Sequence, residues 1–276
     1  MSVLPVERLT FPSAGRALIA YLHRPGAPGP WPAVVLNHGS DLTQNSLPGV
    51  AHVLATAGYL AFTAIRRGYG DSPGPTRLDE VTAPVGQPGH GDQVCARLLA
   101  ESDDVLAALR FLRPLPEVDR TRIAVMGSSY GGINSLLAAS RDPDVRCCVS
   151  FAAAAMTWPH VPEVREFLLR HADAIRCPVL LLQAENDFDL TPSLALAERL
   201  RMRGRICERH LFRPFGIDAM EGHRIFVYAP QIWAPVVLPF LARHLGGAHR
   251  RKGTQQRSRP AGFPRNARRP RRRPGP

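Results

Sequence analysis

Residues 123–139 read IAVMGSSYGGINSLLAA. The first four, Ile123–Met126, form a short continuous apolar run, which is typical of a strand buried on both faces. The small and apolar residues of Ile133–Ala139 predict a helix. Three glycines and two serines lie between these two runs and favour a sharp turn. The segment therefore predicts a strand, a tight turn and a helix in immediate succession.

The same alternation of apolar strands and amphipathic helices extends over residues 1–245. It predicts a doubly wound α/β fold, in which a mostly parallel sheet is covered by helices on both faces. Ligands of such sheets lie beyond the carboxyl ends of the strands. The expected strands are Val6–Phe11, Ala17–His23, Ala33–Asn37, Tyr59–Ile65, Ile123–Met126, Val145–Phe151, Pro178–Gln183 and Arg205–Leu211, and the expected helices are Pro48–Ala57, Val94–Leu112, Ile133–Ala139, Leu194–Arg201 and Ile232–Leu245.

Charge and composition divide the chain in two. Residues 246–276 hold eleven of the 35 Lys and Arg residues and no acidic residue, so that 24 basic and 23 acidic residues remain in 1–245. The first part is long and apolar enough for one α/β domain, whereas the second predicts a disordered Arg/Pro-rich tail. The tail is either an arm for nucleic acid or anionic lipid, or an extension without a role. Without a basic stripe on the domain, nucleic acid is not an expected partner except through this tail.

The sequence shows no signal-peptide pattern and no apolar run long enough to cross a membrane. Its five cysteines form no C-x-x-C pair and no Cys/His metal spacing, and Cys147 and Cys148 lie in an apolar run. We therefore expect a cytoplasmic protein with reduced thiols, no membrane partner, and neither a metal nor an organic cofactor. The sequence leaves the oligomeric state open.

The turn Gly127-Ser-Ser-Tyr-Gly131 fits the pattern G-x-S-x-G. Between a strand and a helix, this pattern is typical of a nucleophile elbow, in which the central serine is exposed on a strained turn. Glycines are needed because side chains two residues on either side of Ser129 would collide with neighbouring backbone. Ser129 is therefore the candidate nucleophile, against the alternative of a glycine-rich structural turn.

A serine hydroxyl needs a base to take its proton, and the base needs an orienting group. In this architecture the acid follows the serine in sequence, and a histidine follows the acid. Asp187 comes just after the apolar strand PVLLLQA, where a carboxylate would lie at the carboxyl edge of the sheet. Asp189 and Glu185 are rivals in the same loop, and Asp187 could instead only cap the next helix.

His223, in the segment MEGHRIF, is the candidate base because it lies in a loop between the last strand and the last helix. The alternative is a loop histidine without a role. The other histidines after Ser129 fit less well. His210 lies in an expected strand, His244 in the last expected helix and His249 in the tail, and the remaining two are His160 and His171.

Hydrolysis through a tetrahedral intermediate requires two donors for the oxyanion. The backbone N–H of Tyr130 is the first candidate, and that of Ser40, in the loop after Ala33–Asn37, is the second. Gly39 would shape this loop and let its backbone approach the substrate. His38 is interpreted as a loop residue that supports the backbone, and His38 and Gly39 are expected beside the substrate.

Several motifs together resemble a known family. NHGS at 37–40, RRGYGDSPG at 66–74, GSSYGG at 127–132, the Asp187 loop and EGH at 221–223 occur in the order typical of the dienelactone-hydrolase-like branch of the α/β-hydrolase superfamily. The resemblance covers about residues 15–245 and extends to the catalytic domains of prolyl-oligopeptidase-like enzymes. It implies a Ser–Asp–His triad with the order found here. Dienelactone hydrolases proper carry a cysteine where this chain has Ser129.

Two further segments have open roles. Arg66 and Arg67 could bind an acidic substrate or belong to a structural turn near the site. The 25 residues between Phe151 and Cys177 predict a minimal cap with one short helix, which suits small soluble substrates. Trp158 is expected to contact the substrate, and with Met156 and Phe167 it lines an acyl pocket or packs in the core; the sequence does not separate these.

The motifs together predict a serine hydrolase that cleaves a carboxylic ester through an acyl-enzyme on Ser129. A small-molecule ester is the expected partner. A serine peptidase of the prolyl-oligopeptidase-like kind or a lactone hydrolase would use the same residues on a different bond. A non-catalytic binding protein on the same fold is the alternative outside enzymes.

Overall fold

The computed structural model describes residues 5–41, 46–246 and 275. Strands and helices alternate through most of this part of the chain, as the sequence predicts. The strands are β1 (Glu7–Ser13), β2 (Arg16–His23), β3 (Trp31–Asn37), β4 (Leu60–Ala64), β5 (Val118–Ser128), β6 (Cys147–Phe151), β7 (Val179–Ala184) and β8 (Cys207–Phe212). The helices are α1 (Pro48–Thr56), α2 (Arg77–Glu80), α3 (His90–Leu112), α4 (Tyr130–Arg141), α5 (Pro162–Ala172), α6 (Thr191–Met202), α7 (Ala219–His223), α8 (Ile225–Tyr228) and α9 (Pro230–Leu245).

The strands form one sheet in the order β1-β2-β4-β3-β5-β6-β7-β8. From β4 to β8 every neighbouring pair is parallel, whereas β1 pairs with β2, and β2 with β4, in antiparallel fashion. The expected mostly parallel sheet is thus confirmed. All residues of β3, β4, β6 and β7 are buried, which is why these strands are apolar throughout rather than alternating.

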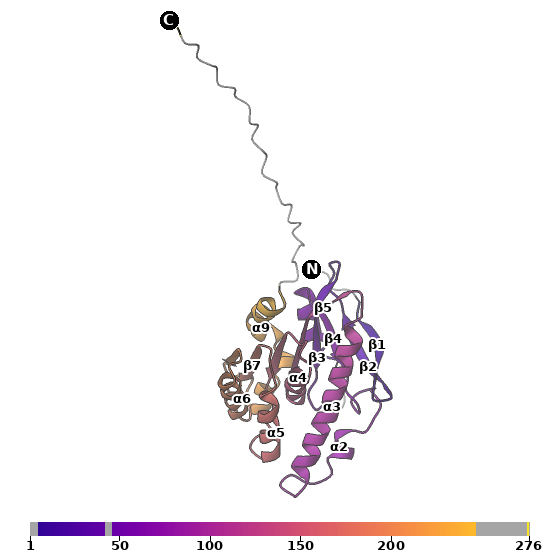
Figure 1. Ribbon diagram of the computed structural model, residues 1–276. Coiled ribbons are helices and arrows are strands. Elements are labelled where there is room, and N and C mark those ends of the chain that lie inside the picture. Colours follow the sequence, from indigo (N-terminus) through magenta and orange to yellow (C-terminus); the bar gives the residue numbers. More distant parts are fainter. Residues whose placement is uncertain (1–4, 42–45, 247–274, 276) are drawn as a thin grey trace.

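Two apolar layers separate the sheet from its helices. On one face, residues of α3, α4, α5 and α6 pack against the sheet in a single cluster that includes Ile133, Leu137 and Leu168. On the other face, α1, α8 and α9 form a second cluster around Trp233 and Phe226. Figure 1 shows α3 and α4 lying in front of the sheet, with β1 and β2 at one edge. Helices on both faces complete the doubly wound α/β architecture.

Some element boundaries differ from the sequence prediction. Helix α3 begins at His90, four residues before the expected start, after an N-cap at Gly89. Strand β5 extends back to Val118 through a stretch that reads as a turn, because Val118 pairs with Trp31 of β3. The short helix α2 lies between β4 and α3, where the sequence predicts no helix. The extension of β5 thus depends on pairing with a distant strand, whereas α2 and the early start of α3 depend on caps formed by adjacent residues.

The segment between β6 and β7 holds one helix, α5, as expected. Among the helices of the described residues, none is long and apolar enough to cross a membrane. The expected disordered tail at 246–276 lies, apart from residues 246 and 275, outside the described residues.

Candidate active site

The turn between β5 and α4 is strained at Ser129, which adopts φ 56° and ψ −124°. A non-glycine residue rarely has a positive φ, and such strain is concentrated at functional sites. A Cβ added to Gly127 or Gly131 would overlap the carbonyl oxygen of Asn37, and one at Gly131 would also overlap that of His38. The glycines are therefore required because the carboxyl end of β3, which pairs in parallel with β5, lies directly against the turn.

Backbone hydrogen bonds fix the direction of the peptide that follows Ser129. The carbonyl of Ser129 accepts a bond from the N–H of Ile133 at 3.0 Å. Because a trans peptide is planar, the N–H of Tyr130 points the opposite way, out of the start of α4. The first N–H groups of a helix have no partner within it. The N–H of Tyr130 is thus directed outward beside Ser129, where an oxyanion donor is expected.

Asp187 and His223 meet although 36 residues separate them. Their atoms Oδ1 and Nδ1 lie 2.7 Å apart, and the two side chains are 0% and 7% exposed. Asp187 follows β7, and His223 ends α7, beyond the carboxyl end of β8. Because Asp187 accepts through a carboxylate oxygen, His223 donates from Nδ1, and its Nε2 then carries a lone pair.

Three donors hold Asp187 in this direction. Besides His223, the N–H of Phe188 donates to Oδ1 at 2.8 Å, and Nε2 of Gln183 donates to Oδ2 at 2.9 Å. The rival Asp189 instead accepts from the N–H and the hydroxyl of Thr191 at the start of α6. Of the three acidic residues in this loop, it is Asp187 that contacts the histidine; Glu185 is exposed.

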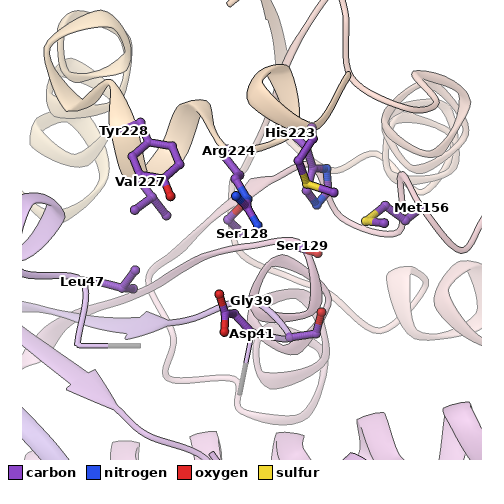
Figure 2. Close-up of a pocket in the computed structure, with 12 residues that line it drawn as sticks. Gly39, Asp41, Leu47, Ser128, Ser129, Met156, His223, Arg224, Val227 and Tyr228 are labelled. Carbon is purple, nitrogen blue, oxygen red and sulfur yellow. The ribbon is translucent and has the colours of Figure 1, made fainter. Parts of the chain in front are cut away.

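Ser129 and His223 line one cavity of about 320 Å³. Figure 2 shows His223 on one side of this cavity and Gly39 and Asp41 on the other, with Ser129 between them. Nε2 of His223 is buried and has no hydrogen-bond partner among the described residues, so it is not bonded to the Ser129 hydroxyl in this structure. Such bonds are often long before a substrate binds.

A second cavity, of about 230 Å³, adjoins the first and shares Ser40, Ser129 and Met156 with it. It is lined by residues from the loop after β6, such as Thr157 and Val161, and by residues that lead into α3. Ser129 therefore lies between two cavities, which suits a substrate with one group on each side of the reacting bond.

Trp158 lines neither cavity. It is 6% exposed and packs in the core cluster that also holds residues of α5, so its expected contact with substrate stays a prediction. Phe167 lies in the same core cluster, whereas Met156 is exposed at both cavities. An apolar loop residue carries no local signal that decides between these two positions.

His38 is fully buried and does not line either of these two cavities, so its expected place beside the substrate also stays a prediction. Its Nε2 accepts from the N–H of Arg66 at 3.2 Å, and its Nδ1 donates to the carbonyl of Gly39 at 2.8 Å. Burial, followed by the charge of Arg66, holds the pKa of His38 well below its usual 6.5. His38 is therefore neutral and supports the backbone, as the sequence interpretation proposed.

The loop after β3 is oriented by these contacts. The Gly39 carbonyl accepts from Nδ1 of His38 and from the guanidinium of Arg66, both of which lie on the buried side. The N–H of Ser40 belongs to the same planar peptide and points in the opposite direction. Gly39 and Ser40 line the first cavity, and a Cβ at Gly39 would lie 3.7 Å from that of Ser129. This backbone thus approaches Ser129 closely.

Arg66, at the start of the loop after β4, has a structural role rather than a substrate-binding one. Arg66 is fully buried and bonds to Glu101 of α3 and to the carbonyls of His38 and Gly39. Arg67 binds Asp104 one turn further along α3. The site prediction missed Glu101, although a sequence signal exists: it falls on the apolar stripe of α3 with Leu98 and Val105.

The described residues hold no group of three or more His, Cys, Asp or Glu side chains placed to bind a metal ion. All five cysteines fall within this part of the chain and are free, as expected. Burial raises the pKa of the partly exposed Cys95 and Cys207 to about 11, so neither is a reactive thiolate at neutral pH.

The fold and the residues at the carboxyl edge of its sheet define an α/β hydrolase. The chain belongs to the dienelactone hydrolase family, whose family model matches residues 18–212. It is 27% identical over 133 residues to the quorum-quenching protein AidA of Acinetobacter baumannii, a match that covers 48% of this chain and 38% of that protein. The chain thus spans well under half of this curated relative.

Solved structures share the fold. An acylaminoacyl peptidase of Pyrococcus horikoshii superposes with a TM-score of 0.69 and 18% identity, over 91% of this chain and 43% of the peptidase. An esterase of Pyrococcus furiosus gives 0.62 and 18% identity, over 88% of this chain and 91% of the esterase. Est1E of Butyrivibrio proteoclasticus, solved with ferulic acid, gives 0.65 and 17%, over 86% and 98%.

Proposed function

We propose that this chain is a serine hydrolase that cleaves carboxylic esters of small molecules. The observation that carries the proposal is the buried pair of Asp187 and His223 beside the strained Ser129. His223 lines the same cavity as Ser129, and its Nε2 has no hydrogen-bond partner among the described residues. A nucleophile, a base and an orienting carboxylate are the three parts of a catalytic triad. All three lie beyond the carboxyl ends of strands, where α/β folds bind their ligands.

In the proposed reaction, Nε2 of His223 takes the proton of the Ser129 hydroxyl as the oxygen attacks the ester carbonyl. Asp187 keeps the proton on Nδ1 and stabilises the imidazolium that forms. The N–H groups of Tyr130 and Ser40 bind the oxyanion. His223 then protonates the leaving alcohol, and a water molecule activated by the same histidine hydrolyses the acyl-enzyme.

The cavities favour a compact substrate. Their volumes, about 320 and 230 Å³, suit an ester with modest groups on each side rather than a long polymer. Arg224 and Asp41 both line the first cavity, so its charges are of both signs. Arg77 lines the second cavity, and no Asp or Glu is among the described residues that line it with Arg77. The positive charge of Arg77 favours a neutral or anionic group over a cationic one in the second cavity.

The test is turnover of p-nitrophenyl acetate and butyrate by the wild type and by Ser129→Ala. We expect kcat to fall about 10⁴-fold or more in the variant. Ser140→Ala, on the outer part of the same helix, is the matched control and should keep wild-type activity. A fluorophosphonate probe should label Ser129 alone, as mapped by mass spectrometry. Equal turnover in Ser129→Ala, or no turnover in the wild type, would refute the proposal.

A peptidase of the prolyl-oligopeptidase-like kind would use the same triad on an amide. Comparing an ester and an anilide of the same acyl group separates the two, since a peptidase should retain substantial anilide turnover. A lactone hydrolase would turn over cyclic esters in preference to the linear ones. A non-catalytic binding protein would show neither turnover nor covalent labelling.

A further inference from the structure

We propose that Arg66 and Glu101 are positioning residues that set the direction of the Ser40 N–H, and that this buried ion pair thereby builds one half of the oxyanion hole. The inference rests on the proposed function and deepens it. Ser40 lines both cavities described above, whereas the side chains of Arg66 and Glu101 are 0% exposed and line neither of these two cavities.

The guanidinium of Arg66 reaches two consecutive carbonyls of the loop after β3. Nη1 donates to the carbonyl of His38 at 2.8 Å, and Nη2 donates to that of Gly39 at 3.0 Å. The third donor, Nε, binds Oε2 of Glu101 at 2.7 Å. A guanidinium is planar and its donors have fixed directions, so binding all three acceptors fixes the plane of the Gly39–Ser40 peptide.

Glu101 is the anchor of this arrangement. Its Oε1 accepts from the hydroxyl of Tyr69 at 2.9 Å and from Nε of Arg97 at 2.7 Å. Its Oε2 accepts from Arg66 and from Nδ2 of Asn134, the latter at 3.0 Å. A carboxylate with four donors in a buried setting is held in one orientation, and so is the guanidinium that it binds.

The same carboxylate also reaches the start of α4. Asn134, which donates to Glu101, donates from the same nitrogen to the carbonyl of Tyr130 at 2.9 Å. The other proposed oxyanion donor, the N–H of Tyr130, lies in the peptide just before this carbonyl. Glu101 of α3 therefore ties together the loop after β3 and the start of α4, which are separated by about 90 residues along the chain.

The kinetic consequence follows from when the oxyanion exists. An N–H that points at the tetrahedral oxygen stabilises the transition state more than the bound ester. A small rotation of the Gly39–Ser40 peptide should therefore lower kcat and leave KM nearly unchanged. The same rotation should weaken a boronic acid inhibitor, since its tetrahedral adduct on Ser129 uses the same donors.

Arg66→Lys is the decisive variant, because lysine keeps the charge beside Glu101 but lacks the fork that holds the carbonyls. Arg67→Lys is the matched control: the neighbouring Arg67 pairs with Asp104 of the same helix and does not bind the loop after β3. With active sites counted by fluorophosphonate labelling, kcat, KM and the boronic acid Ki are measured for both variants.

We expect Arg66→Lys to lower kcat and raise the Ki by about 10- to 100-fold, below the 10²–10³ for outright loss of a donor, with KM within about twofold. Arg67→Lys should stay within about twofold of wild type in all three. If Arg66→Lys does not fold, Tyr69→Phe, which removes one donor to Glu101, decides the matter, with kcat expected to fall about threefold or more.

Wild-type kcat in a folded Arg66→Lys, or an equal loss in Arg67→Lys, overturns the assignment while leaving the proposed function intact. Wild-type kcat in Tyr69→Phe overturns it in the same way if Arg66→Lys does not fold. A wild-type chain without Ser129-dependent turnover refutes the proposed function, and this assignment falls with it.

Discussion

Replacing Asp187 by asparagine tests the acid of the proposed triad and its surroundings together. The amide can place its oxygen or its NH₂ group at the position of Oδ1. At that position the N–H of Phe188 and Nδ1 of His223 both point at Asp187. An oxygen there keeps both bonds, whereas an NH₂ group would face the backbone donor of Phe188. The structure therefore favours the oxygen, and His223 keeps its proton on Nδ1.

The NH₂ group then faces Nε2 of Gln183. Oε1 of Gln183 is buried without a hydrogen-bond partner among the described residues, so a flip of the Gln183 amide presents an acceptor to the new donor. The flip also loses the bond that Nε2 of Gln183 donates to the carbonyl of Asp189 at 2.9 Å. What the variant loses is the negative charge next to the imidazolium. Two charges about 4 Å apart at an effective dielectric of about 20 attract by about 4 kcal/mol.

We expect kcat/KM for p-nitrophenyl butyrate to fall about 10³-fold in Asp187→Asn, since about 1.4 kcal/mol corresponds to a factor of ten. Loss of a charged hydrogen-bond partner should also lower the free energy of unfolding by about 2 kcal/mol, and hence Tm by roughly 4–8 °C. Steady-state kinetics at pH 8 and thermal unfolding of the same samples provide both numbers.

Asp189→Asn is the matched control, because Asp189 lies in the same loop but binds Thr191. It should keep kcat/KM within about threefold, as it touches no proposed catalytic group. A loss below tenfold in Asp187→Asn would remove Asp187 from the triad. A loss well above about 10⁴-fold, the value for an inverted histidine tautomer, would show that the argument from Phe188 and Gln183 is wrong.

Three further predictions concern the turn, the buried histidine and the thiols. Gly131→Ala should fail to give folded protein because the new Cβ would overlap two carbonyl oxygens, whereas Gly39→Ala, with only ordinary contacts, should fold. Circular dichroism and Tm distinguish the two variants. A fully stable Gly131→Ala would contradict the conclusion that position 131 requires glycine. The pKa of His38 is lowered on folding, so the unfolded chain binds a proton at this histidine at higher pH than the folded chain does. The neutral His38 therefore contributes fully to the free energy of unfolding above about pH 6.5, and this contribution falls by about 1.4 kcal/mol per pH unit below it. Urea unfolding at pH 7.5 and 5.5 should show this slope, and His38→Gln should be less sensitive by that amount; an equal slope would mean that His38 is not held neutral. Iodoacetamide at pH 7 should leave esterase activity unchanged while a fluorophosphonate abolishes it, because burial raises the pKa of each of the five thiols; inactivation by iodoacetamide would point to a cysteine in the reaction.

Much of the fold could be predicted because its signals are local. Apolar runs such as Ala33–Asn37 and Ile123–Met126 mark strands buried on both faces, and the helices between them require a parallel sheet. The elbow at Ser129 was predictable for the same reason, since the need for Gly127 and Gly131 is a property of one turn. Loops were less predictable: α2 and the early start of α3 depend on caps within a segment rich in Gly and Pro.

The choice between neighbours in the site needed distances that sequence does not contain. Asp187 and Asp189 are two residues apart in one loop, and both are acids after a buried strand. Only the fold shows that Asp187 faces His223 while Asp189 faces the start of α6. Trp158 and Met156 likewise follow the same strand, yet one is buried in the core and the other exposed at the cavities.

The sequence by itself determined an α/β sheet, a strained Ser129 on a glycine turn, and an acid and a histidine in the expected order. Only the tertiary structure decided that His38 and Arg66 lie beneath the site, that Glu101 joins them to α4, and that the Ser40 N–H points outward. The physical reason is the distance along the sequence between the residues that determine each feature. Turns and strands follow from the sterics and apolar patterning of adjacent residues, whereas the direction of a backbone N–H depends on donors that folding brings from distant parts of the chain.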